Sequence, residues 1–238
     1  MRSGIFITGT DTGVGKTLVA YGLAALLRNL GYKVGVMKPA ETGCAEKDGV
    51  LFPQDAYYLK EASGCEEPLE TICPYRLKEP LAPSVAAERS GVKIDIDLIE
   101  TIYTELSSKH DITIVEGAGG LLVPLLPHYT YADFARLLKL PILVVAANRL
   151  GVINHLLLTL EHASCRGLQV LGYIFNRLDA QLSLAADTNR EALLSLTAVP
   201  CLGEIPFIDN LEARRSSLAD VFEEKLDIQP LGPALPHR

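Results

Sequence analysis

An apolar run leads directly into a loop of small residues that ends in Gly-Lys-Thr. The run is Ile5-Phe6-Ile7-Thr8, and the loop extends from residue 9 to residue 17. Small residues let backbone N–H groups curl around phosphate oxygens, and the start of the following helix adds unpaired donors. Lys16 can reach the outer phosphates of a nucleotide, and the Thr17 hydroxyl can ligate Mg²⁺. The pattern therefore predicts a loop that binds a triphosphate.

The spacing of this loop differs from that of the usual P-loop. Five residues separate Gly9 from Gly15, whereas the common pattern has four. Thr10 occupies the position where a glycine is expected. The strand before the loop and the helix after it still favour a phosphate site over a Gly-rich turn beside a chance lysine.

Two carboxylates are candidate ligands for a magnesium ion that accompanies the phosphates. Glu116 directly follows the β-branched run 112–115, and it precedes glycines that let backbone approach a ligand closely. Asp55 is the second candidate. An exposed glutamate and a plain helix cap are the respective alternatives. The sequence therefore predicts a magnesium site at Thr17, Asp55 and Glu116.

Two further polar residues follow predicted strands. Lys38 comes after the run 33–37, and Pro39 fixes the direction of the chain. A second lysine near the phosphates suggests stabilisation of a second anion, such as an acceptor, although solvated lysines are common at strand ends. Asn176 could read a base edge with its amide, or it could simply form a turn.

Strand and helix signals alternate along the whole chain. Strands are expected at 5–8, 33–37, 112–115, 141–147, 168–175 and 201–205. Helices are expected at 16–30, from 55, from 95 or 97 through 106, and at 131–138, 152–165, 185–196 and 211–222, with an irregular stretch at 61–92. Apolar strands separated by helices predict an α/β fold, namely a doubly wound, mainly parallel sheet of about seven strands that is P-loop NTPase-like. We expect a single domain over 1–238 whose tail after about residue 227 is loosely packed.

Composition excludes several function classes. The chain has 238 residues and a net charge of −7, which argues against non-specific binding to nucleic acid or to an anionic membrane. No stretch approaches the roughly 18 apolar residues that a spanning helix needs. The odd number of cysteines without a Cys-x-x-Cys pair favours reduced thiols in a cytoplasmic protein. The sequence assigns no role to these cysteines, which are Cys44, Cys65, Cys73, Cys165 and Cys201.

With these residues in hand, the chain resembles the dethiobiotin synthetase family of biotin synthesis. The matching segments are 8–17, 38–39, 54–56, 115–120, 151–155, 176–177 and 203–206. They extend over most of the predicted sheet, and the first and fourth are specific in combination. The segment 65–109 and the residues after 210 match only loosely.

The resemblance implies an ATP-dependent C–N ligase that acts as a homodimer. Its substrates would be MgATP, CO₂ and 7,8-diaminononanoate. One amine takes up CO₂ to form a carbamate, which attacks the γ-phosphate. The second amine then attacks the carbamic-phosphoric anhydride, closing the ureido ring and releasing phosphate. The products would be dethiobiotin, ADP and phosphate.

The resemblance also assigns roles to residues of this chain. Lys16 and Lys38 would be catalytic, and Thr17, Asp55 and Glu116 would serve Mg²⁺. The ATP-binding residues would be Gly13, Val14, Gly15, Lys16, Thr17, Asp55, Glu116, Gly117, Ala118, Gly119, Asn176, Arg177, Ile205, Pro206 and Phe207. The substrate residues would be Thr12, Thr42, Asn154 and His155, with the 151–155 loop of a partner subunit receiving the substrate carboxylate. An adenine-side contact at Glu212 is a weaker expectation.

A nucleotide-driven switch of the partition and division-site ATPase type is the main alternative. Those proteins carry a second lysine five positions before the P-loop lysine, where this chain has Asp11. An amide-forming relative acting on a tetrapyrrole carboxylate would need an additional glutamine-hydrolysing domain. The sequence does not distinguish ATP from CTP or GTP.

Overall fold

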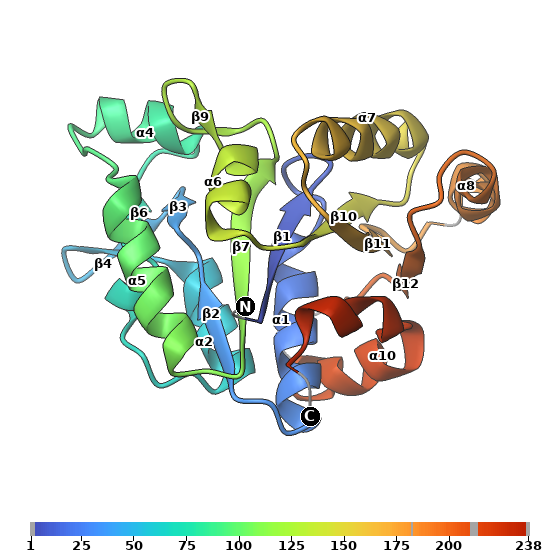
Figure 1. Cartoon of the computed structure of the whole chain (residues 1–238), viewed down its shortest axis with the longest axis horizontal. Coiled ribbons are helices and arrows are strands. Elements are labelled where there is room, and N and C mark those ends of the chain that lie inside the picture. The colour runs from blue at the N-terminus through green and yellow to red at the C-terminus, as the bar shows by residue number, and fades with distance from the viewer. Residues whose placement is uncertain (1–2, 182, 210–213, 237–238) are drawn as a thin grey trace.

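Six parallel strands form the central sheet, in the order β12-β11-β10-β1-β7-β2 (Figure 1). The computed structural model describes residues 3–181, 183–209 and 214–236. The strands are β1 (Gly4–Gly9), β2 (Val34–Met37), β7 (Ile112–Gly120), β10 (Ile142–Ala147), β11 (Val170–Asn176) and β12 (Cys201–Ile205). This arrangement confirms the predicted parallel α/β fold, with six strands in the main sheet rather than about seven.

Helices cover both faces of this sheet. One face carries α1 (Lys16–Asn29), α2 (Gln54–Ser63) and α10 (Leu218–Lys225), which pack side by side. The other carries α5 (Ile96–Ser108), α6 (Tyr131–Leu138), α7 (Val152–Cys165) and α8 (Leu184–Leu194). Figure 1 shows α7 above the strands, with α1 and α10 below them. No described helix combines the length and the apolar character needed to cross a membrane.

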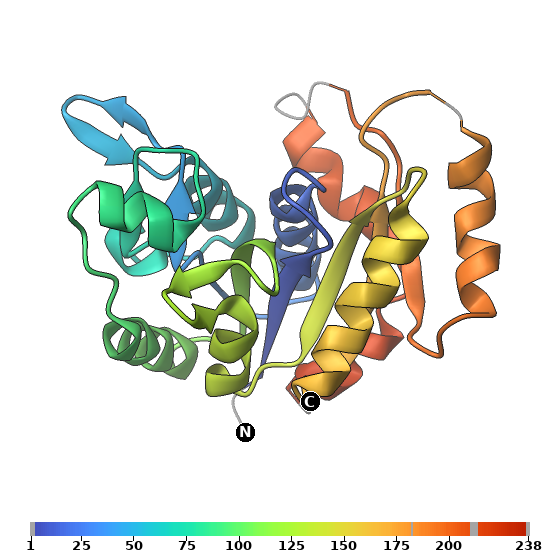
Figure 2. The same cartoon turned by 90° about the horizontal axis from the view of Figure 1, so that it is seen from above.

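Short elements fill the stretch between α1 and α5. They are β3 (Ala40–Thr42), β4 (Ala45–Lys47), β5 (Val50–Phe52), α3 (Leu69–Ile72), β6 (Tyr75–Leu77) and α4 (Pro83–Arg89). β3 pairs with β6, so the stretch 61–92 is more regular than expected. Strands β4 and β5 form a hairpin that projects from the molecule (Figure 2). Its turn residues Asp48 and Gly49 both have positive φ, as a two-residue hairpin turn requires.

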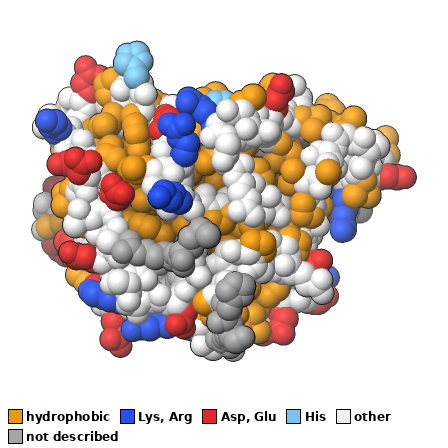
Figure 3. Space-filling model, viewed as in Figure 1, with side chains coloured by type: hydrophobic (Ala, Val, Ile, Leu, Met, Phe, Trp, Pro, Cys, Tyr) orange, Lys and Arg blue, Asp and Glu red, His pale blue; other side chains and the backbone are white. Residues whose placement is uncertain are grey.

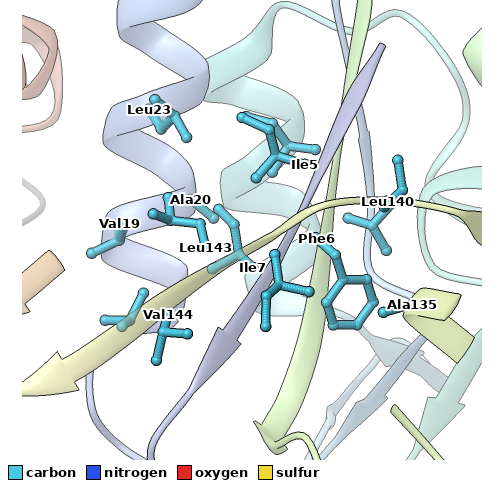
Figure 4. Packing of buried hydrophobic residues seen from close by; sticks show 14 of the residues in the cluster. Ile5, Phe6, Ile7, Val19, Ala20, Leu23, Ala135, Leu140, Leu143 and Val144 are labelled. Carbon is cyan, nitrogen blue, oxygen red and sulfur yellow. The ribbon is translucent and has the colours of Figure 1, made fainter. Parts of the chain in front are cut away.

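Aliphatic side chains build the core around β1. Ile5, Phe6 and Ile7 are fully buried. Figure 4 shows Val19, Ala20 and Leu23 of α1 on one side of this strand, while Phe6 points towards Ala135 of α6 on the other. Gly22 matters in this packing, because a Cβ atom there would lie 2.2 Å from the ring of Phe222. The glycine therefore lets α10 lie close against α1.

The C-terminal segment packs onto the core. It contains the 3₁₀ segments η1 (Arg215–Ser217) and η2 (Gln229–Ala234). Leu231 is fully buried, and Ala234 is 3% exposed. The Asp227 N–H also donates to the Leu202 carbonyl at 2.8 Å. The described part of the tail thus packs on the core and is not loosely held as expected, while residues 211–213 of the expected last helix lie outside the described residues.

The first prediction concerns this tail. We expect Leu231→Ala to lower the free energy of unfolding by about 2–5 kcal/mol, the usual effect of a leucine-to-alanine cavity in a core. Urea denaturation monitored by circular dichroism measures the change. Leu196→Ala is a matched control, because Leu196 is 54% exposed. Equal stability of the two variants would contradict the burial of the tail.

Candidate phosphate and metal site

The predicted phosphate loop joins the end of β1 to the start of α1. Gly13 and Gly15 have φ values of 74° and 91°, in the left-handed region that favours glycine. No described side chain caps the N-terminus of α1, whose N-cap residue is Gly15. The first N–H groups of α1 therefore stay available for an anion, at the positive end of the helix dipole.

Asn176, at the end of β11, holds this loop in place by a side-chain hydrogen bond. Its Nδ2 donates to the Val14 carbonyl at 3.0 Å. A Cβ atom on Gly15 would lie 2.0 Å from the same nitrogen, so the contact requires glycine. Within the part of the chain that the structure describes, the buried Asn176 Oδ1 has no hydrogen-bond partner. Asn176 thus holds the loop and keeps one acceptor unsatisfied beside it.

Lys38 is buried among carboxylates at the end of β2. The side chain is only 4% exposed, and its Nζ donates to Glu116 Oε1 at 2.5 Å and to Asp55 Oδ2 at 3.1 Å. Burial alone would lower the pKa of Lys38, but the two carboxylates outweigh burial and hold the pKa above its usual value. Lys38 is therefore firmly protonated in this arrangement.

Glu116 lies within β7 and is fully buried. Burial raises its pKa, and the Lys38 ammonium opposes that shift. Its Oε1 also accepts a hydrogen bond from the Thr17 hydroxyl at 2.9 Å. Its Oε2 is buried and has no hydrogen-bond partner among the described residues. A buried carboxylate oxygen without a partner is costly unless a cation or a donor reaches it.

Lys16 lies at the start of α1 on the same cavity. Its Nζ donates to the backbone carbonyl of Asp11 at 3.3 Å. Burial, together with the neighbouring charge of Lys38, lowers the pKa of Lys16 to about 8. The protonated form of Lys16 is thus poorly stabilised by the protein alone, and an anion beside it would supply the missing stabilisation.

One cavity of about 320 Å³ brings most of these groups together. It is lined by Thr12, Gly13, Gly15, Lys16, Thr17, Lys38, Glu41, Thr42, Asp55, Glu116, Ala118 and Gly119. The two lysines and the predicted metal ligands therefore line the same cavity as Thr12 and Thr42, the residues expected to contact the diamine. The cavity lies at the carboxyl ends of β1, β2 and β7. Open α/β sheets bind ligands at this edge.

Sequence reasoning missed Glu41, which lines the same cavity from β3. Its carboxylate accepts hydrogen bonds from the N–H groups of Asp55 at 2.9 Å and Ala56 at 3.0 Å. Burial and the nearby charge of Asp55 raise the pKa of Glu41 to about 7. No local sequence signal marks this residue, because its partners lie in the first turn of α2.

Other predicted residues lie beyond this cavity. Arg177 follows β11 and forms an ion pair with Glu204 and another with Asp187 at 3.6 Å. Its N–H donates to the Ile205 carbonyl at 3.0 Å, which brings the 205–207 segment beside Asn176. Glu212 lies outside the described residues.

The two predicted carboxylate-binding residues lie at the start of α7. Asn154 and His155 are exposed on the single chain. His155 lines a separate cavity of about 200 Å³, together with Gly9 and Gly120. The described chain thus does not bring them into the cavity that holds Lys16 and Lys38.

The oxygen donors in the main cavity fit a magnesium ion. Within residues 3–181, 183–209 and 214–236 no cluster of three or more His, Cys, Asp or Glu is arranged for a metal. The set here is two carboxylates and the Thr17 hydroxyl, with Glu116 Oε2 still unpartnered. Mg²⁺ prefers such sparse oxygen sites, because phosphate oxygens and water complete its coordination.

This fold and this site define a P-loop nucleotide-binding protein. Solved structures agree with the fold. The septum site-determining protein MinD from Pyrococcus horikoshii matches at a TM-score of 0.56 and 18% identity, over 93% of this chain and 86% of that one. A ParA family ATPase from Chlorobium tepidum matches at 0.57 and 14% identity, over 94% and 93%. At such identities the likeness is one of fold alone.

Sequence relatives identify the family. A family model described as an AAA domain matches residues 3–215. ATP-dependent dethiobiotin synthetases from Thermodesulfovibrio yellowstonii and Bacillus cereus are 38% and 42% identical to this chain. The first match covers 97% of this chain and 99% of the relative, and the second covers 87% and 84%. The chain belongs to the family of ATP-dependent dethiobiotin synthetases, which are ligases, and the resemblance seen in the sequence is confirmed.

The second prediction compares two glycines of the phosphate loop. Gly13→Ala and Gly15→Ala both place a side chain at positive φ, which costs roughly 1–2 kcal/mol. Only Gly15→Ala also collides with Asn176, because a Cβ on Gly13 meets nothing within 4 Å. We expect Gly15→Ala to lose ADP binding and more stability than Gly13→Ala. Calorimetric ADP titration and urea denaturation measure both effects, and equal losses would contradict the collision.

Proposed function

We propose that this chain is a dethiobiotin synthase that carboxylates 7,8-diaminononanoate with CO₂ and MgATP. The reaction would pass through a carbamate and a carbamic-phosphoric anhydride to dethiobiotin, ADP and phosphate. One observation carries the proposal: Lys16 and Lys38 line a single cavity with Asp55 and Glu116, in a chain of this family.

The proposed chemistry brings two anions into contact. A carbamate must attack a polyanionic phosphate, so positive charge is needed where they meet. Lys16 at the start of α1 and Lys38 at the end of β2 supply that charge, and the first N–H groups of α1 add donors. A bound Mg²⁺ would neutralise phosphate charge. Ring closure then needs little more than positioning, because it is intramolecular.

The hydrogen bonds of Lys38 suggest how the charges are redistributed. Its ammonium is now shared between Glu116 and Asp55. When Thr17, Asp55 and Glu116 serve as metal ligands, Lys38 would turn towards the carbamate and the transferred phosphoryl group. The carboxylates thus keep the buried lysine protonated until its anionic partners arrive.

The nucleoside end would lie along Asn176 and the 205–207 segment. The unpartnered Asn176 Oδ1 can accept a hydrogen bond from an exocyclic amine, such as that of adenine. Arg177, already paired with Glu204, would support this wall. The Gly117–Gly119 backbone would line the phosphate end, with Ile205, Pro206 and Phe207 next to the base.

We further propose a homodimer whose substrate site lies at the subunit interface. Thr12 and Thr42 would hold the diamine end, while Asn154 and His155 of a second copy would receive the carboxylate. Exposed leucines on and near α7 and α8 support a contact surface, because Leu150, Leu158 and Leu184 are 87%, 57% and 82% exposed. Figure 3 shows apolar side chains on this part of the surface.

The five free cysteines favour a cytoplasmic location for the protein.

The direct test is dethiobiotin formation from the diamine, bicarbonate and MgATP, followed by mass detection of the product. Phosphate release should require both the diamine and bicarbonate. Reactions lacking either one are the controls. Phosphate release that responds instead to DNA, lipid or a protein partner would favour the switch alternative and refute the synthase.

The third prediction concerns Lys38. Lys38→Gln should keep the fold and lower kcat by about 10²–10³-fold, as loss of one preorganised charge-stabilising donor does. Product formation under saturating substrates measures kcat. Lys78→Gln is the matched control, because the Lys78 side chain is 69% exposed and forms a surface ion pair with Glu46. Turnover of Lys38→Gln at the wild-type rate would remove Lys38 from the mechanism.

The fourth prediction concerns Glu116. Glu116→Gln should raise the Mg²⁺ concentration that gives half-maximal activity, because an amide is a weaker ligand for a hard cation than a carboxylate. A magnesium titration at fixed ATP measures the shift. Curves that overlay those of the wild type would show that Glu116 does not serve the metal.

A further inference from the structure

Glu41 connects the lysine-bearing segment to the first turn of α2. It lies in β3, next to Thr42 and three residues after Lys38. The residue is only 6% exposed, and both of its carboxylate oxygens accept hydrogen bonds. One oxygen accepts from the Asp55 N–H and the other from the Ala56 N–H, both within 3.0 Å.

Helix α2 has no capping side chain of its own. Its N-cap residue is Pro53, which provides no side-chain hydrogen bond. The first N–H groups of a helix need partners, and the positive end of the helix dipole favours a carboxylate there. Glu41 supplies both from 14 residues earlier in the chain. By contrast, α5 is capped locally by Asp95, which accepts from Asp97 and Leu98.

The long-range cap bears directly on a candidate metal ligand. Asp55 is in the first turn of α2, and its Oδ2 lies 3.1 Å from Lys38 Nζ. Because Glu41 holds the backbone N–H of Asp55 itself, it fixes the point from which the Asp55 carboxylate extends. A helix start that shifted or frayed would carry this carboxylate away from Glu116 and Thr17.

We propose that Glu41 is a positioning residue that holds Asp55 where it can serve a divalent cation beside the nucleotide phosphates. This inference rests on the proposed metal role of Asp55. Through Glu41, strand β3 also connects the start of α2 to the diamine end of the cavity, because the neighbouring Thr42 lines the same cavity from the same strand.

The test measures metal binding without the diamine or turnover. Mn²⁺ binding to the full chain in the presence of ADP is followed by electron paramagnetic resonance. We expect Glu41→Ala to weaken Mn²⁺ binding by about tenfold, as loss of an outer partner of a metal ligand does. Glu41→Gln should weaken it as well, because an amide offers only one acceptor atom for two N–H donors. If Glu41→Ala does not fold, Glu41→Gln carries the test.

Asp95→Ala is the matched control, since it also removes two capping hydrogen bonds but at α5. It should lose comparable stability in urea and retain wild-type Mn²⁺ binding. Wild-type Mn²⁺ affinity in the Glu41 variants would overturn the proposal.

A double-mutant cycle separates positioning from simple loss of charge. If Glu41 acts through Asp55, adding Glu41→Ala to Asp55→Asn should weaken Mn²⁺ binding little further. Additive losses would mean that Glu41 acts by its charge alone and would overturn the proposal. Dethiobiotin formation by the unmodified chain is measured separately, so failure of the synthase assignment remains distinguishable from failure of this one.

Discussion

The buried ammonium of Lys38 is the constraint on which the site depends. Removing a charge from water costs several kcal/mol, and this cost is offset only when partners lie at hydrogen-bond distance. Glu116 and Asp55 provide such partners at 2.5 and 3.1 Å. Loss of one partner from a buried pair typically costs about 3–5 kcal/mol. The end of β2, strand β7 and the start of α2 must therefore meet at one point.

The sheet order satisfies this constraint. Strand β7 lies between β1 and β2, although the three are far apart in sequence. Neighbouring strands are about 4.8 Å apart. The phosphate loop after β1, Glu116 in β7 and Lys38 after β2 are consequently within side-chain reach of one another. Asp55 joins them because α2 packs against α1 on the same face of the sheet.

Residues at strand ends and long helices could be predicted from the sequence, because their signals are local. Helix α6 begins and ends where expected, and a capping box between Thr130 and Asp133 marks its start. The pairing of β6 with β3 was missed, and segment 61–92 was expected to be irregular, because this pairing is non-local and leaves no signal in the sequence around β6. The burial of Leu231 and the cap from Glu41 were missed for the same reason. Strand adjacency likewise has no local signal.

The charges of the cavity bear on how a nucleotide can enter it. Its two lysines face the three carboxylates Glu41, Asp55 and Glu116, so the fully ionised cavity carries one net negative charge. A triphosphate would meet like charge at that point. Burial favours the uncharged forms of Lys16 and Glu41. The loss of one positive and one negative charge leaves the net charge of the cavity unchanged. Under the proposed function, the nucleotide must therefore enter together with a divalent cation that occupies the carboxylates. Only then is the Lys38 ammonium free to contact the second anion. The ion pairs that stabilise the buried Lys38 therefore also hold it away from the reaction until metal and nucleotide are both bound.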